Sequence, residues 1–168
     1  MKRNVPAFQA ASLIPEAPVA IKTGYRILLW GVPLLAGVYF LVGMSTPLLI
    51  RYGQSQAESV LSLYSHFCHQ ILERSFVIGG TPLGLCSRCT GFYGGLLGGS
   101  LAVAMDGDKR SLGLRSLALL IAPALIDFWF DRSSLVWGSN VLRCLSGLLA
   151  GIGVVGFAFP RLLWAARR

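Results

Sequence analysis

Charged side chains are scarce in this sequence. Asp, Glu, Lys and Arg make up 13% of the 168 residues, whereas hydrophobic residues make up 54%. Soluble domains carry roughly 25% charged residues, so the composition argues against an ordinary soluble protein. The sequence also lacks a nucleotide-binding loop, a Ser-His-Asp set and a paired-carboxylate acid–base site, which argues against a soluble-type hydrolase.

Acidic residues are the rarest charged group, with seven Asp and Glu against fifteen Lys and Arg, and the net charge is +8. An excess of basic residues can indicate nucleic-acid binding, but no basic run with interleaved aromatic residues is present. We therefore expect no nucleic-acid partner, and we look for the origin of the charge in membrane topology instead.

Four stretches contain little or no interior charge, at residues 27–50, 90–105, 114–130 and 141–160. A helix needs about 20 apolar residues to cross a bilayer, a length that the first and last stretches reach. The second and third are shorter, and the second can be extended back into a cysteine motif. The pattern predicts an all-α fold, an integral membrane four-helix bundle surrounded by lipid. We expect a flexible cytoplasmic tail at 1–26 and one membrane domain at 27–164, with helices at about 27–50, 86–105, 114–131 and 140–160.

The basic residues are distributed unevenly along this pattern. If both termini are cytoplasmic, ten of the fifteen fall on the cytoplasmic side: Lys2, Arg3, Lys22, Arg26, Lys109, Arg110, Arg115, Arg161, Arg167 and Arg168. Cytoplasmic loops of membrane proteins carry an excess of Lys and Arg. The distribution therefore predicts a multi-pass protein of the cell membrane with both termini in the cytoplasm, and it places residues 51–89 and the turn at 131–140 on the extracytoplasmic side.

The predicted extracytoplasmic segment begins with apolar residues at three- and four-residue spacing. Ala57, Val60, Leu61, Tyr64 and Cys68 belong to this stripe, which predicts an amphipathic helix over about 56–72. We expect this helix to lie at the outer face of the membrane or to pack over the bundle.

Three cysteines and a histidine follow one another closely, at Cys68, His69, Cys86 and Cys89. Cys₃His is a recognised zinc ligand set, and the sequence therefore predicts a site for zinc or another thiophilic metal. Adjacent residues of an unbroken helix do not face each other, so a site that uses both Cys68 and His69 requires the helix to end or distort there. Arg88 and the start of the next helix favour thiolates at Cys86 and Cys89. The alternative is a set of buried, unreactive cysteines.

The remaining polar residues lie near the predicted outer ends of the last two helices. Asp127 and Arg143 are expected either to form an ion pair between these helices or to bind a polar or anionic ligand beside the thiols. Ser139 or Asn140 is suited to cap the last helix. Cys144, inside that helix, is expected to be a small core residue.

Glycines recur at four-residue spacing in two of the predicted helices, at Gly91, Gly95 and Gly99 and again at Gly147 and Gly151. Small residues at this spacing allow close packing of membrane helices. We expect the second and fourth helices to be neighbours. The same faces could instead recruit a second copy or another membrane subunit.

The segments "CHQILERSF", "CSRCTGFYGG" and "SNVLR" together resemble the predicted membrane proteins of the domain of unknown function 2085 family. The resemblance covers roughly residues 60–155 and implies a set of recurring polar residues, but no activity. In this chain Phe128, Trp129 and Phe130 follow Asp127, where the family pattern has Gly and Gln. By position, the recurring polar residues are Cys68, His69, Gln70, Arg74, Ser75, Cys86, Arg88, Cys89, Asp127, Asn140 and Arg143.

Three functions are compatible with the sequence. The favoured one is a metal-binding membrane protein, because an odd trio of thiols beside a histidine does not suit simple disulfides. The second is a thiol–disulfide oxidoreductase that uses Cys86 and Cys89, similar in layout to quinone-linked disulfide oxidases and with a quinone as its cofactor. The third is a structural or assembly protein. The sequence leaves any enzymatic activity open.

Overall fold

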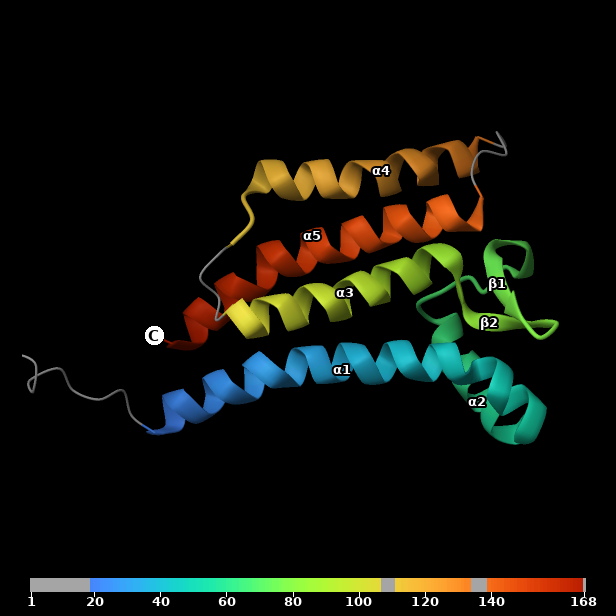
Figure 1. Cartoon of the computed structure of the whole chain (residues 1–168), viewed down its shortest axis with the longest axis horizontal. Helices are drawn as coiled ribbons and strands as arrows, with labels where there is room; N and C mark the ends of the chain where they lie inside the picture. The colour runs from blue at the N-terminus through green and yellow to red at the C-terminus, as the bar shows by residue number, and fades with distance from the viewer. Residues whose placement is uncertain (1–18, 107–110, 134–138, 168) are drawn as a thin grey trace, which may run out of the picture.

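The computed structural model describes residues 19–106, 111–133 and 139–167, and these residues are mostly helical (Figure 1). Four long helices run side by side along the long axis: α1 (Val19–Tyr52), α3 (Ser87–Asp106), α4 (Leu114–Arg132) and α5 (Asn140–Arg167). A short helix, α2 (Gln54–Ser65), a 3₁₀ turn, η2 (Leu72–Arg74), and a hairpin of β1 (Ser75–Ile78) and β2 (Thr81–Cys86) gather at one end. We call this the hairpin end.

The long helices lie in the order α1, α3, α5, α4 (Figure 1). The start of α1 and the end of α5 lie together at the end of the molecule opposite the hairpin end. The predicted helix positions agree with α3 and α4 to within about two residues. At the predicted tail, residues 1–18 lie outside the described residues, and residues 19–26 already belong to α1. At the other end of the chain, α5 continues past the expected residue 160 to Arg167.

Small residues fill the contact between α3 and α5. A Cβ atom at Gly91 or Gly95 would overlap the α5 backbone at Cys144 or Leu148, and one at Gly147 would overlap the Arg88 carbonyl of α3. Such close backbone approach is how glycines hold membrane helices together, so the predicted pairing of these helices is confirmed. The buried residues of α3 are all small: Ser87, Thr90, Gly91, Gly95, Gly99, Ser100 and Ala104.

Large apolar side chains point outward instead. On α1, Leu34 and Leu35 are exposed, and Leu119 and Trp129 are exposed on α4. A soluble protein rarely leaves large apolar patches in water, so these exposed apolar faces favour a membrane protein. Two helical segments, Thr23–Tyr52 and Asn140–Ala166, are long and apolar enough to cross a bilayer.

The hairpin is the element that the sequence did not predict, since we expected an all-α protein. Its turn is formed by Gly79 and Gly80, whose φ angles of 58° and 82° are both in the left-handed region. Two such residues make the tight turn that matches the twist of antiparallel strands. Pro82 lies within β2, and a proline argues against a strand in sequence, so these residues indicated only a loop.

Candidate functional site

Three cysteines converge at the hairpin end. The sulfur atoms of Cys68, Cys86 and Cys89 all lie within 4.8 Å of one another. They come from three different elements: the loop after α2, the last residue of β2 and the first turn of α3. We call them the thiol cluster. The three cysteines were expected to lie together from their spacing in the sequence, and the structure confirms this.

The end of α2 makes this convergence possible. The helix ends at Ser65, and the Tyr64 carbonyl accepts hydrogen bonds from the N–H groups of Phe67 and Cys68, at 3.0 and 2.8 Å. Gln70 then adopts a φ of 48°, and its Nε2 donates to the Leu61 carbonyl at 2.8 Å. The chain therefore turns back and directs Cys68 inward. The predicted helix over 56–72 is wrong beyond residue 65, because Gln70 closes a turn that helical periodicity cannot reveal.

Aromatic side chains enclose one side of the thiol cluster. Cys68 is 2% exposed and packs with Tyr64 and Leu85, while Tyr39 and Tyr93 lie against this group. The ring centroids of Tyr39 are 4.5 Å from Tyr64 and 4.4 Å from Tyr93. These rings exclude water from the buried side of the cluster, which gives it the character of a closed site.

Hydrogen bonds distinguish the sulfurs from one another. The pKa of the Cys68 thiol is lowered because the side chains of Cys86 and then Cys89 donate to it, and the Cys86 backbone N–H also donates to its Sγ at 3.2 Å. The pKa of Cys86 is raised, chiefly because its thiol is the donor to Cys68. We expected Arg88 to favour a Cys86 thiolate. Arg88 instead bonds to Asp127, and Cys68 is the thiol whose pKa is lowered, by hydrogen bonds from Cys86 and Cys89.

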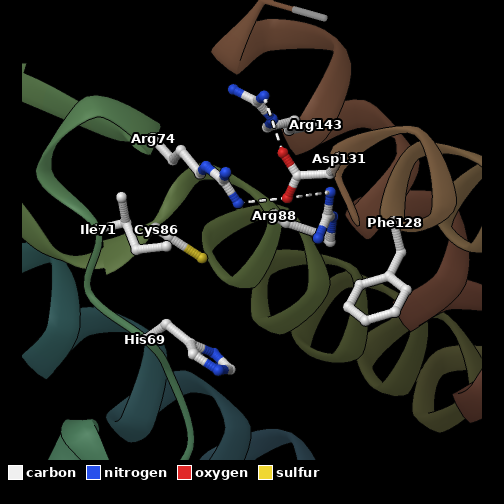
Figure 2. Close-up of a pocket in the computed structure, with 8 residues that line it drawn as sticks. All are labelled: His69, Ile71, Arg74, Cys86, Arg88, Phe128, Asp131 and Arg143. Carbon is white, nitrogen blue, oxygen red and sulfur yellow. Dashed lines mark hydrogen bonds and ion pairs between the residues drawn. The ribbon is translucent and has the colours of Figure 1, made fainter. Parts of the chain in front are cut away.

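His69 does not join the thiol cluster. Its side chain is exposed, and among the described residues the group of metal-binding atoms that lie together contains only the three sulfurs. The sequence places His69 next to Cys68, but the irregular loop after α2 turns the two side chains apart. His69 lines a neighbouring cavity (Figure 2).

A charged network lies beside the thiols. Arg88 pairs with Asp127, and its Nε donates to Asp127 Oδ2 at 2.9 Å. Asp131 accepts hydrogen bonds from Arg74 and from Arg143, and Arg143 Nη2 lies 3.4 Å from Asp131 Oδ1 (Figure 2). The predicted Asp127–Arg143 ion pair is therefore wrong. Asp127 faces α3, and Arg143 reaches the carboxylate one helical turn further along α4.

Polar side chains also join the hairpin to the bundle. Ser87 donates its hydroxyl hydrogen to the Arg74 carbonyl, and Asn140 Nδ2 donates to the Ser75 carbonyl at 3.3 Å. The Ser139 hydroxyl accepts the Leu142 N–H at 3.4 Å and caps α5, as predicted. The starts of α3 and α5 thus fix the position of β1, and with it the position of Arg74.

Sequence reasoning identified most of this region but missed two of its components. Asp131 accepts from two arginines, yet it was not among the candidate residues. Its position four residues after Asp127 was the signal, because residues at this spacing share a helix face. The tyrosine wall was missed because Tyr39, Tyr64 and Tyr93 are far apart in sequence.

The three sulfurs of the thiol cluster can together bind a soft metal ion. In tetrahedral geometry with a Zn–S distance of about 2.3 Å, two sulfur ligands lie roughly 3.8 Å apart. The sulfurs of the thiol cluster all lie within 4.8 Å of one another, so they need to move together only slightly to bind zinc. Three thiolates with no carboxylate among them favour soft ions such as zinc or copper(I) over magnesium or calcium.

Comparison with known proteins places the chain among uncharacterised membrane proteins. A family model described as a predicted membrane protein (DUF2085) matches residues 68–157. An uncharacterized protein of Methanocaldococcus jannaschii is 31% identical over 59% of this chain and 65% of its own length, so the chain spans slightly less than two thirds of that relative.

A second uncharacterized protein, from Methanothermobacter thermautotrophicus, is 36% identical over 54% of this chain and 83% of its own length. No solved structure shows a significant match. The family match begins at Cys68 and includes the whole thiol cluster and every arginine and aspartate of the charged network. The chain belongs to the DUF2085 family of predicted membrane proteins.

Proposed function

We propose that this protein is a multi-pass membrane protein that binds a thiophilic metal ion, such as zinc, through Cys68, Cys86 and Cys89. The observation that carries the proposal is the convergence of three sulfurs from three separate elements within 4.8 Å. A packing role for cysteine does not require the sulfurs to meet. A simple disulfide uses only two of them.

The bound ion would join the loop after α2, the hairpin and α3. Cys68 is buried and the tyrosines cover one side, as in structural metal sites, which are closed. Because His69 is exposed and outside the group, we assign the ion to the three sulfurs and do not include the predicted imidazole ligand.

The experiment measures metal content and cysteine oxidation state on one sample of the full chain, purified without chelator. We expect close to one thiophilic ion per chain by mass spectrometry, and three thiols that react with an alkylating mass tag only after metal removal. Cys86→Ser should abolish the metal. Cys144→Ser is the matched control, since Cys144 lies in α5 outside the thiol cluster, and it should keep the metal. Metal-free wild-type protein, or equal metal in both variants, would contradict the proposal.

A thiol–disulfide oxidoreductase is the second candidate, favoured by the position of Cys86 and Cys89 at the start of α3 with Cys68 beside them. Against it, the pKa of Cys86 is raised rather than lowered, and an attacking thiol needs thiolate character. The same sample decides between the two candidates. A Cys86–Cys89 disulfide that depends on the cellular quinone pool would favour the oxidoreductase.

We further propose that α1, α3, α4 and α5 all cross the membrane, with both termini in the cytoplasm and the hairpin end outside. Support comes from the apolar outward faces of α1 and α4 and from the excess of Lys and Arg in three parts of the sequence: before residue 27, between α3 and α4, and after residue 160. In intact cells, an impermeant thiol reagent should label Ser62→Cys on α2, and it should label Ser111→Cys, just before α4, only after lysis. The reverse pattern would invert the topology.

A further inference from the structure

A cavity of about 510 Å³ opens beside the thiol cluster, between the hairpin, α3, α4 and α5 (Figure 2). Its lining includes Arg74, Arg88, Arg143 and His69, and Asp131 is the only carboxylate among the described residues that line it. Cys86 is the one member of the thiol cluster that borders the cavity. The cavity is therefore dominated by hydrogen-bond donors that carry positive charge.

Asp131 orders the arginines without neutralising them. It accepts hydrogen bonds from Arg74 and Arg143, and its Oδ2 lies 4.0 Å from Arg88 Nη2. Two carboxylates, Asp127 and Asp131, therefore face three guanidinium groups, which leaves one positive charge in excess. Asp131 is 11% exposed and Arg88 25% exposed. Excess charge in such a partly desolvated position is unfavourable unless an anion accompanies it.

Arg143 gives an independent indication of a missing acceptor. The residue is buried, with 9% of its surface exposed, and its side chain is 11% exposed. Nη1 donates to Asn140 Oδ1 and Nη2 to Asp131 Oδ1, both at a long 3.4 Å, while Nε has no hydrogen-bond partner among the described residues. Buried donors are almost always satisfied. The Arg143 guanidinium makes two long hydrogen bonds and has a third donor unpaired. A small shift of this side chain would let it donate to a bound ligand.

We propose that this cavity binds the phosphate group of a phosphorylated ligand. Arginine forks match the oxygen spacing of phosphate and form charge-assisted hydrogen bonds with it. The ring of Phe128 lies on the cavity wall, 5.9 Å from the Arg88 guanidinium carbon, and Ile71 lines the opposite side. These apolar walls suit the organic part of the ligand. The phosphate can belong to a phospholipid headgroup or to a soluble phosphate, and the site does not depend on a metal at the thiols.

The test uses the full chain in lipid nanodiscs. In phosphatidylcholine nanodiscs, binding of inorganic phosphate is measured by calorimetry. In nanodiscs that also contain phosphatidylglycerol, the lipid retained by the protein is measured by native mass spectrometry. The variants are Arg143→Gln and Arg74→Gln. The Arg74 side chain is 36% exposed, so we expect its replacement to destabilise the fold less than that of Arg143. Arg51→Gln is the matched control, because Arg51 lies at the hairpin end of α1 but does not line the cavity.

We expect each cavity variant to weaken binding by roughly tenfold or more, as the loss of a charge-assisted bond implies, and Arg51→Gln to have no effect. Saturable binding of inorganic phosphate would identify a soluble ligand. Retained phosphatidylglycerol that inorganic phosphate does not displace would identify a lipid headgroup. Binding of neither probe by folded wild-type protein, or an equal loss in Arg51→Gln and Arg74→Gln, would overturn the proposal. Metal content is measured on the same samples. A protein without metal at the thiol cluster is thereby distinguished from one that does not bind phosphate in the cavity.

Discussion

The α3–α5 contact and the hairpin end are held together by different physics, although α3 contributes to both. The contact is built from glycines at which a Cβ atom would overlap a neighbouring backbone, so its stability depends on the small size of these residues. At the hairpin end, thiols, guanidinium groups and carboxylates meet, so its stability depends on charge and bound ligands. One turn separates them: Arg88 and Cys89 precede Gly91 on the same helix. The comparison indicates that the glycine contact fixes the position of α3. That position in turn places Arg88 and Cys89 among the polar groups of the hairpin end.

The largest effect is expected from enlarging the glycine contact. In Gly95→Val the new side chain would overlap the Leu148 carbonyl of α5, and backbone cannot yield as a side chain can. We expect loss of the folded, monodisperse protein in fluorescence-detected size-exclusion chromatography. Gly98→Ala is the control on the same helix, because a Cβ placed there would meet no described atom within 4 Å beyond the adjacent residues and backbone of α3 itself. It should retain or slightly raise the thermal stability, since alanine favours a helix by about 0.5–1 kcal/mol over glycine. Equal behaviour of the two variants would refute the size argument.

Removing the carboxylate that joins two arginines should have the next largest effect. Asp131→Asn leaves the buried Arg143 without its charge partner, and breaking a buried pair costs about 3–5 kcal/mol. Asp127→Asn should cost less, because its partner Arg88 is 25% exposed whereas Arg143 is 11% exposed. Unfolding of both variants in a denaturant titration gives the comparison. The charge argument fails if Asp127→Asn is the more damaging change.

This contrast also explains what the sequence could predict. Regular patterns were sufficient for the contact, because glycines at four-residue spacing identify two helix faces directly. They were also sufficient for the bounds of α3 and α4, which lie close to the two shorter charge-poor stretches. The hairpin end was only partly predictable. The spacing of Cys68, Cys86 and Cys89 indicated a common site. The turn at Gln70, which directs Cys68 inward and His69 outward, is held by local hydrogen bonds such as the one from Gln70 to the Leu61 carbonyl, and these leave no periodic signal.

The pairing of charges was beyond sequence reasoning for a related reason. Asp127 and Asp131 share a face of α4, and which arginine each one meets depends on the rotation of α4 relative to α3 and α5. That rotation is set by contacts such as the one between Gly153 and the Leu120 side chain. A rotation of this kind leaves no periodic signal in the sequence, so the Asp127–Arg143 pair was a reasonable but wrong expectation.

Metal removal is a third way to separate the two regions. An ion that binds only the folded state at 100 times its dissociation constant stabilises that state by about 2.7 kcal/mol. We therefore expect a thiophilic chelator to lower the thermal midpoint of the wild-type protein and of Cys144→Ser. Cys89→Ser should show no such response, because it already lacks a ligand. The helical circular dichroism of the chelated protein should persist below its new midpoint, since the glycine contact contains no metal ligand. A chelator that melts the helices at room temperature would show that the two regions are not separable.

The smallest effect is expected at the cap that joins the regions. The Ser139 hydroxyl accepts the Leu142 N–H at the start of α5, one turn before Arg143 and two turns before Gly147. Loss of a serine cap costs about 1 kcal/mol, so Ser139→Ala should lower the thermal midpoint slightly, and Ser139→Asp should restore it because aspartate caps equally well. Fraying of the first turn of α5 would loosen Arg143 but leave Gly147 and Gly151 packed. The variant should therefore weaken phosphate binding while the α3–α5 contact, probed by a disulfide engineered between the two helices, stays intact. Loosening of both together would mean that the hairpin end also supports the contact, and the order of dependence inferred above would have to be reversed.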